Sequence, residues 1–416
     1  MKPGRAVVIG AGVVGAWSAY WLAREGWHVE LIDQGKFGDA CSAGNCGLVC
    51  PSHILPLCAP GAIRKTLPLL LKRNSPFTIR FRPDPALISW LWRFSRNCRE
   101  DLMWQTGAAL HALLQESHRE YETIIRECGL DCAWQPVGGM FVYDDEHHLH
   151  AFSKTNDQLV RRFGVGAELL DARALAAAEP ALNEGPAGAW LYRCDSFLHP
   201  NGFLAEFRRV LERVGVVIRE QCPATGVVAG SGSITSISTP QGPLAADSFV
   251  FSTGSWSPLL SDMLGVRLPI QPGKGYSLTS TAPPSVPRYS VIFENARVAV
   301  TPMGKVFRVG STMEFAGHDE SIRPERLELL RAAARKYLRQ PYQPSEEHRW
   351  WGWRPMTPDG KPFIDFSPRY SNAVIAAGHN MVGMSTGPAT GRLACELIAG
   401  QSPFTDPSPF RIAGRC

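Results

Sequence analysis

The stretch AVVIGAGVVGAWSAYWLA, residues 6–23, contains no charged side chain and follows a basic N-terminal flank. Uncharged runs of this length also occur in membrane-spanning helices and export signals. Here, however, Gly10, Gly12 and Gly15 form the pattern G-x-G-x-x-G between a β-branched run and a helix-like run. In a strand-turn-helix unit these glycines permit a tight turn, close approach of a pyrophosphate and close packing of the helix on the strand. The stretch therefore predicts a dinucleotide-binding fold.

The residues that follow support this interpretation. Gly26 ends the helix-like run, and an apolar run from Val29 to Ile32 closes with Asp33. An acidic residue about 20 positions beyond the glycines is placed to accept hydrogen bonds from a ribose. A membrane-spanning helix would not need that acid. We therefore predict a β-α-β unit whose helix N-terminal amides face the pyrophosphate.

Length and charge limit the remaining possibilities. A chain of 416 residues predicts about two domains, because single cores rarely grow so large. The net charge of +5 suits anionic small molecules or lipid headgroups, and we find no recognition motif for nucleic acid, so no nucleic-acid partner is expected.

The chain has 11 cysteines, an odd number, and we recognise no export signal. These features favour reduced thiols in the cytoplasm. Two groups of cysteines were considered as metal ligands: Cys41 with Cys46 and Cys50, and Cys128 with Cys132. Neither group has C-x-x-C spacing or a histidine pair, so the sequence predicts no metal site.

Residues 60–100 combine nine basic residues with two acidic ones, Asp84 and Glu100, and the basic residues alternate with apolar runs. This pattern fits a basic amphipathic surface that lies on anionic lipid. It fits equally a helix pair packed on the protein with its basic side chains in water. Both interpretations stay open at the level of sequence.

The rest of the chain predicts an α/β protein (α+β overall) with a Rossmann-type domain and a second domain built on an antiparallel sheet with helices. Helical patterns cover 101–128, 159–179, 200–215 and 326–339. Strand-like runs alternate with turns over 266–315, and the C-terminus has a strand, a Gly-rich turn and a helix. The first domain is therefore expected to be discontinuous. We assign residues 1–90, 195–265 and 348–416 to it, and 91–194 and 266–347 to the substrate domain.

Several further blocks occur in a specific order: SAGNCGL, STGSWS, GKGYSLT, GWRPMTPDGKPFI and GHNMVGMSTGPATG. With the N-terminal motif, they make the sequence resemble the FAD-dependent D-amino-acid dehydrogenases, within the family that includes glycine oxidase and sarcosine oxidase. The resemblance covers nearly the whole chain. It implies FAD, oxidation of an amine next to a carboxylate, and a flavin domain paired with a sheet-based substrate domain.

The resemblance also assigns cofactor-binding residues. Asp33 stands where the family more often has Glu, and Asn380 where it more often has Gly. The C-terminal flavin block contains no cysteine, so noncovalent FAD is expected unless Cys46 reacts. The residues expected to bind FAD are Gly10, Gly12, Val13, Val14, Gly15, Asp33, Gln34, Ser42, Asn45, Cys46, Gly47, Leu48, Gly254, Gly378, His379, Asn380, Met381, Val382, Gly383, Met384 and Thr386.

Arg354 is the main candidate for binding substrate, because a planar guanidinium can grip a carboxylate with two charge-assisted hydrogen bonds. The alternative is a structural arginine that pairs with Asp359. Tyr276 is expected to line the same pocket, or else to be a sheet aromatic. His53 and His379 are candidates for a catalytic role beside the flavin, although lone histidines are more often structural.

The reaction implied is oxidation of a D-amino acid by hydride transfer from Cα to flavin N5, followed by hydrolysis to a 2-oxo acid and ammonia. Electrons would pass to a quinone or dye. Alternatives are cyclic or N-methyl amino acids and related substrates (D-proline, hydroxyproline, sarcosine, glycine), a flavin-binding subunit of a heteromer, and a nicotinamide dehydrogenase. We expect a cytoplasmic protein, and peripheral contact of residues 60–100 with the inner face of the cell membrane stays open.

Overall fold

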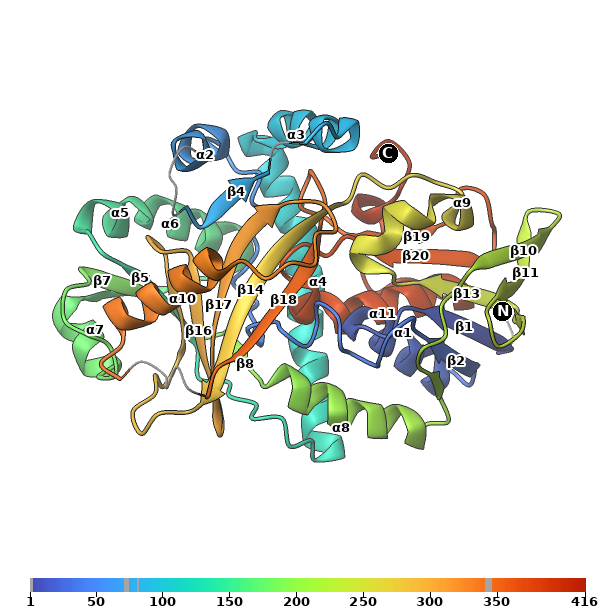
Figure 1. Cartoon of the computed structure of the whole chain (residues 1–416), viewed down its shortest axis with the longest axis horizontal. Helices are drawn as coiled ribbons and strands as arrows, with labels where there is room; N and C mark the ends of the chain where they lie inside the picture. Colours follow the sequence, from blue (N-terminus) through green and yellow to red (C-terminus); the bar gives the residue numbers. More distant parts are fainter. Residues whose placement is uncertain (1–2, 71–74, 81, 341–345) are drawn as a thin grey trace.

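The computed structural model of the chain describes residues 3–70, 75–80, 82–340 and 346–416. Figure 1 shows two sheets beside one another, with the N-terminal strand in the sheet on the right and the longer strands β14 and β17 in the sheet on the left. Helix α11 lies with the right-hand sheet, and α10 lies across the left-hand one.

The smaller sheet has the mostly parallel, Rossmann-type topology that the N-terminal motif predicts. Its central strands β1, β13 and β20 are buried on both faces, as expected for near-continuous apolar runs in a parallel sheet. All neighbouring pairs are parallel except β19 with β20. The strand order is β19 (Phe363–Phe366), β20 (Ala373–Ala377), β13 (Ser248–Phe251), β1 (Arg5–Ile9), β2 (His28–Ile32) and β9 (Val217–Arg219).

Three helices cover this sheet. The first, α1 (Val13–Arg24), packs against α11 (Gly383–Ala399), and α4 (Glu100–Cys128) packs on α11. The first two helices cross very closely, because a Cβ atom at Gly391 would lie 2.5 Å from the Trp17 carbonyl carbon. The C-terminal end of the chain thus completes the N-terminal domain, and the predicted discontinuous Rossmann-type fold is confirmed.

The larger sheet is mostly antiparallel, with parallel pairs only between β15 and β5 and between β17 and β4 among its described strands. Helix α10 (Pro324–Tyr337) packs on one face, and the other face contacts the loops of the smaller sheet. The strand order is β18 (His348–Met356), β14 (Gln271–Thr281), β17 (Val306–Phe315), β16 (Val298–Met303), β15 (Ser290–Phe293), β5 (Gly139–Tyr143), β7 (Gly188–Tyr192) and β6 (Glu168–Asp171), with β4 (Phe77–Ile79) beside β17.

Smaller elements connect the two sheets. The predicted helix over 159–179 is wrong in one respect, because α6 (Ser153–Phe163) ends at Gly164 and strand β6 comes before the next helix. The remaining elements are α5 (Glu146–Ala151), α7 (Ala172–Ala178), α8 (Pro200–Arg213), α9 (Ser261–Leu264), β3 (Leu48–Val49), β8 (Ser196–Phe197), β10 (Gly226–Gly230), β11 (Ser233–Ser238) and β12 (Leu244–Ala245).

The expected division into two domains stays a prediction. Strands β4 and β18 fall within ranges assigned to the dinucleotide domain, but both pair with strands of the larger sheet. Along the chain, the change from the larger sheet back to the smaller one therefore comes after β18, whereas the predicted domain boundary comes before it.

The basic segment forms α2 (Ala62–Leu70) and α3 (Pro85–Asn97), while Lys72 and Arg73 lie outside the described residues. Helix α3 is anchored, because Leu87 and Trp90 are buried against Phe315 and Met356 and the Trp90 indole donates to the Met356 carbonyl at 2.9 Å. This packing fits the helix-pair interpretation. Among the described residues, no helix combines the length and apolar character needed to cross a bilayer.

Candidate functional site

A cavity of about 1290 Å³ is lined by both sheets and their loops. Its lining extends from Asp33 past Gly12 and Ser42 to the start of α11, and on to Arg354. Most predicted site residues line it, whereas Gly15, Gly47, Gly378 and Thr386 do not. Those on the lining are Gly10, Gly12, Val13, Val14, Asp33, Gln34, Ser42, Asn45, Cys46, Leu48, His53, Gly254, Tyr276, Arg354, His379, Asn380, Met381, Val382, Gly383 and Met384.

The glycine motif forms the tight turn that its sequence predicts. Gly10 has φ +102°, which disfavours side chains, and a Cβ atom at Gly15 would lie 1.8 Å from the Gly10 carbonyl oxygen. At Gly12, by contrast, the nearest atom that a Cβ would meet is Ser42 Oγ at 3.4 Å. The backbone at Gly12 is therefore open on the cavity side, as close approach of a pyrophosphate requires.

Asp33 lies at the end of β2 and is held by backbone amides. Its Oδ2 accepts from Ala11 N and its Oδ1 accepts from Gly35 N, both at 2.7 Å. Burial raises the pKa of this carboxyl, although these two hydrogen bonds oppose the shift. Each oxygen can still accept from a second donor such as a ribose hydroxyl.

Two polar side chains shape the small-residue loop. Ser42 Oγ accepts from Val13 N, the first amide of α1, at 3.0 Å, and Asn45 Oδ1 accepts from Gly47 N at 2.7 Å. A Cβ atom at Gly47 would lie 1.9 Å from the Leu198 carbonyl oxygen, so this position packs behind the cavity. The loop therefore holds Ser42 at the helix N-terminus, where anions bind.

Asn380 adopts φ +53°, a conformation that asparagine tolerates better than most residues. Its amide donates to the Pro355 carbonyl at 3.0 Å, and its side chain accepts from Thr357 N and donates to the Gly360 and Gly378 carbonyls. Asparagine at a family glycine position thus keeps a left-handed backbone and ties the segment after β18 to the start of α11.

Arg354 lies on β18 opposite Gly273 of β14. Its guanidinium lies directly against the backbone of Gly275. Any side chain at that position would collide with it, because a Cβ atom there would lie 2.3 Å from Nη1. It donates to the Thr312 carbonyl at 2.8 Å and pairs with no carboxylate among the described residues. Removal from water lowers its pKa, and the neighbouring thiols of Cys41 and Cys46 partly offset that shift. A cation that lines a cavity without a counter-ion is suited to bind an anionic group.

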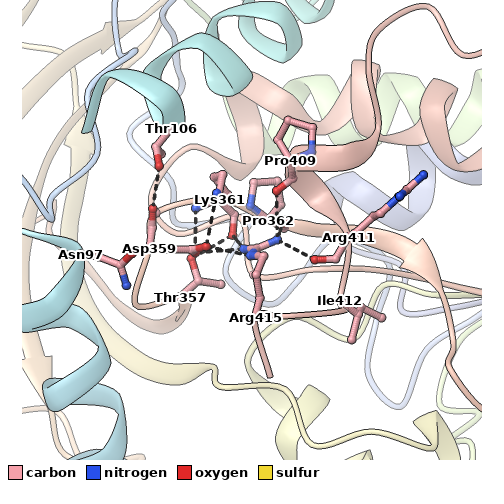
Figure 2. A network of polar contacts seen from close by, with 12 residues as sticks. Asn97, Thr106, Thr357, Asp359, Lys361, Pro362, Pro409, Arg411, Ile412 and Arg415 are labelled. Atoms are coloured by element: carbon pink, nitrogen blue, oxygen red, sulfur yellow. Dashed lines mark hydrogen bonds and ion pairs between the residues drawn. The ribbon is translucent and has the colours of Figure 1, made fainter. Parts of the chain in front are cut away.

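The alternative partner of Arg354, Asp359, is engaged elsewhere, as Figure 2 shows. Arg415 donates to both Asp359 oxygens at 2.7 and 2.9 Å, and Lys361 lies 3.7 Å away. The interpretation of Arg354 as a structural arginine paired with Asp359 is therefore wrong.

Tyr276 does not join Arg354, although it is among the cavity-lining residues. Side chains alternate along β14, and Tyr276 lies opposite Trp351, in the apolar cluster that includes α10. Its hydroxyl donates to Glu314 at 2.9 Å. The structure places the hydroxyl with Glu314 on the α10 face, so Tyr276 matches the sheet-aromatic alternative.

His53 and His379 both lie at the cavity and carry neutral rings at pH 7. Burial lowers the pKa of His53 to about 4 and that of His379 to about 3. His379 Nε2 lies 3.0 Å from Thr390 Oγ1, whereas the buried His53 Nδ1 has no hydrogen-bond partner among the described residues. His53 also contacts the ring of Phe141.

Three residues of the larger sheet complete the site and were not predicted. The Trp350 indole lies between Gly44 and Gly352, where Cβ atoms would come within 1.9 and 2.3 Å of it. Arg308 donates to the Ala43 and Asn45 carbonyls at 2.7 and 2.6 Å. Phe141 lines the cavity beside His53. A signal was present in the sequence for Trp350 alone, which lies four residues before Arg354 in a tryptophan-rich block.

These features define a dinucleotide-dependent enzyme with two sheets and a shared cavity, and the open backbone at Gly12 and the length of the cavity fit an extended cofactor such as FAD. The family described as DAO, FAD dependent oxidoreductase, matches residues 5–397. The chain belongs to this family. The resemblance, the fold class and the expectation of FAD are thereby confirmed.

Relatives extend this assignment over the full length. The chain is 32% identical to the D-amino acid dehydrogenase of Xanthobacter autotrophicus, covering 98% of both chains, and 31% identical to that of Agrobacterium fabrum, again covering 98% of both. Among solved structures it is similar to glycine oxidase from Geobacillus kaustophilus (TM-score 0.78, 20% identity, 99% of both chains). It is also similar to L-proline dehydrogenase from P. horikoshii (TM-score 0.73, 19% identity, 99% of this chain and 97% of the other).

Proposed function

We propose that the protein oxidises D-amino acids at Cα, yielding an imino acid that water hydrolyses to a 2-oxo acid and ammonia. The observation that carries this proposal is the guanidinium of Arg354, which lines the cavity and has no carboxylate partner among the described residues. A substrate carboxylate would supply the missing charge. The names of the full-length relatives support the same substrate class.

Bound FAD supplies the two-electron acceptor, and the residues of this chain have to position the substrate. Gly10, Gly12 and Ser42 would hold the pyrophosphate, and Asp33 the ribose. Arg354 would fix the carboxylate end of the substrate and so set the direction of its Cα–H bond.

The walls of the cavity then exclude water from the reacting carbon. Trp350 and Phe141 supply aromatic surface. His53 and His379, with pKa values near 4 and 3, are uncharged at neutral pH and do not repel the substrate ammonium. Neither is a strong base, so the ammonium proton is released to bulk water before the cavity walls exclude solvent from the reacting carbon.

The test is anaerobic reduction of the flavin in the purified holoenzyme. We would follow bleaching of flavin absorbance while adding D-amino acids, their L-enantiomers, both prolines, hydroxyproline, glycine and sarcosine. Bleaching by several D-isomers supports the proposal. Bleaching by proline, hydroxyproline, glycine or sarcosine alone would replace it with a cyclic or N-methyl amino-acid oxidoreductase, and no bleaching by any of them would favour a subunit that needs a partner.

For the electron acceptor, we propose a quinone reached at a membrane surface. The segment of α2 and α3 supports this proposal, because Leu67, Ile88 and Trp92 are 57%, 64% and 58% exposed beside exposed basic residues. Leu67 also lines the cavity, together with Trp90 of α3. An apolar acceptor could thus reach the cavity from the same side on which the helices meet lipid.

Vesicle binding tests this second proposal. The holoenzyme should cosediment with vesicles of anionic lipid at low salt and be released at high salt. Leu67→Ser with Trp92→Ser should weaken cosedimentation and ubiquinone reduction, while a dye acceptor is used unchanged. Val228→Ser is the control, since Val228 is 50% exposed on β10, at the far end of the molecule (Figure 1). Equal cosedimentation of the wild type and all variants with the vesicles would contradict the proposal.

A further inference from the structure

A compact group of metal-ligand side chains lies beside the cavity, and none of them binds the substrate or accepts a proton in the proposed reaction. Cys50, His53 and Asp195 each offer one ligand atom, and the three atoms lie within 4.8 Å of one another. Cys50 and Asp195 are buried, at 1% exposure each. Buried groups of this kind are either paired by hydrogen bonds or bound to a metal.

The backbone brings these residues together in a fixed way. Strands β3 and β8 pair antiparallel, with Leu48 opposite Phe197 and Val49 opposite Ser196. Cys50 directly follows β3 and Asp195 directly precedes β8, so both residues lie at the same end of this strand pair. A turn then brings His53 back, because its amide donates to the Cys50 carbonyl at 3.1 Å.

The carboxylate is already oriented by its neighbours. Ser52 donates to Asp195 Oδ1 from its amide at 3.0 Å and to Oδ2 from its hydroxyl at 2.6 Å. Oδ1 also accepts from Cys194 Sγ at 3.8 Å, and the Cys50 thiol hydrogen-bonds the same carboxylate, so the two thiols already lie at ligand distance from it. Hydrogen bonds of this kind commonly hold metal-binding carboxylates in place.

The histidine provides an independent indication of a ligand. His53 Nδ1 is buried and has no hydrogen-bond partner among the described residues. An unpaired buried ring nitrogen is costly, and binding a metal is one way to satisfy it. The exposed Cys194 offers a fourth ligand atom and a second sulfur, since its Sγ donates to Asp195 Oδ1 at 3.8 Å.

We infer that Cys50, His53 and Asp195 bind a borderline-soft divalent cation of the Zn²⁺ class, with Cys194 or water as the fourth ligand. A thiolate, an imidazole and a carboxylate form the mixed set that Zn²⁺ accepts, and three protein ligands are typical of its open sites. Binding releases a proton from the Cys50 thiol and fixes His53 beside the cavity. The sequence-based expectation of no metal stays a prediction; it rests on C-x-x-C spacing and histidine pairs, whereas the inferred site uses the C-x-x-H spacing of Cys50 and His53 with the distant Asp195.

The experiment measures metal in the holoenzyme rather than turnover. The protein is stripped with a chelator, incubated with Zn²⁺, separated from free metal and analysed for bound zinc. Wild-type protein should keep about one equivalent, as a three-ligand site does. Cys50→Ala and Asp195→Asn should bind at least about tenfold more weakly, the range known for loss of metal-site partners. Cys58→Ala is the matched control, since Cys58 is buried on the same segment at 2% exposure.

Co²⁺ provides a readout that does not depend on the variants folding. In stripped wild-type holoenzyme, Co²⁺ should give the intense red-region bands of tetrahedral thiolate coordination, where oxidised flavin does not absorb. Weak octahedral bands, failure of wild type to retain zinc, or equal retention in Cys50→Ala would overturn the inference.

Discussion

Arg354 and Arg415 lie 61 positions apart in the C-terminal part of the chain, yet their surroundings are opposite. Arg415 is fully engaged, with both Asp359 oxygens and the Lys361 and Pro362 carbonyls as acceptors (Figure 2). Arg354 has one carbonyl acceptor and no carboxylate among the described residues, although it faces a cavity. This is the difference expected between an arginine that stabilises the fold and one whose donors are free for a ligand, the role proposed for Arg354.

The largest effect should come from Arg354. Arg354→Met should lower kcat/KM for a D-amino acid by about 100- to 1000-fold, because the substrate carboxylate loses its buried charged partner. The free energy of unfolding should stay the same or rise, since the substitution removes a charge that has no counter-ion. Steady-state kinetics and chemical unfolding would measure both quantities. Arg354→Lys should recover part of the loss, and unchanged kcat/KM in either variant would contradict the binding role.

Arg415→Met should have the opposite profile. The free energy of unfolding should fall by about 2–4 kcal/mol, because Asp359 loses its paired cation inside the fold. kcat/KM per bound flavin should change less than about threefold, since no contact with the cavity is lost. The exposed Arg411, on the same segment, provides the control Arg411→Met. A large fall in kcat/KM without loss of stability would contradict the assignment of Arg415 as a structural arginine.

The pH dependence of stability should reveal the buried His379. Its pKa is about 3 in the folded protein and 6.5 ordinarily, so between these values only the unfolded chain takes up the proton. The contribution of His379 to the free energy of unfolding is therefore fully present above pH 6.5 and is lost as the pH falls below that value. Its share of the loss between pH 7 and pH 5 should be about 2 kcal/mol.

Unfolding of wild type and His379→Gln at both pH values would measure this share. The variant should lose less stability on acidification than the wild type does. If the free energy of unfolding fell equally with pH in the wild type and in His379→Gln, the predicted contribution of His379 would be contradicted.

The smallest kinetic effect is expected from Tyr276→Phe. The hydroxyl donates to Glu314 on the α10 face, so kcat/KM should change by less than about threefold while stability falls by about 1–2 kcal/mol. The same kinetic and unfolding measurements apply. A kinetic loss above about tenfold would place Tyr276 with Arg354 at the substrate, contrary to the strand alternation seen here.

The parts that sequence predicted well depend on local pattern. The turn at Gly10, Gly12 and Gly15 and the acid at Asp33 lie within one β-α-β unit. At each glycine the surrounding atoms explain why a side chain is absent. Helix α4 was predicted almost to the residue because its apolar positions repeat at helical spacing.

The parts that sequence missed depend on register and on distant partners. The face on which Tyr276 points is set by its pairing with Trp351 and by an irregularity between β14 and β17, where Ser311 and Thr312 have positive φ. The partner of Asp359 lies 56 positions away, and Asp195 lies 143 positions from Ser52. No local pattern encodes such pairs.

The contact between Asn380 and Pro355 has a thermodynamic consequence. Asn380, in the block expected to approach the flavin, holds the backbone next to Arg354 through its amide and, through its side chain, the turn at Thr357. Cofactor affinity and carboxylate affinity therefore share one structural element and should be coupled. Since coupling free energies are reciprocal, a carboxylate inhibitor should tighten flavin binding by the same factor by which the flavin tightens the inhibitor.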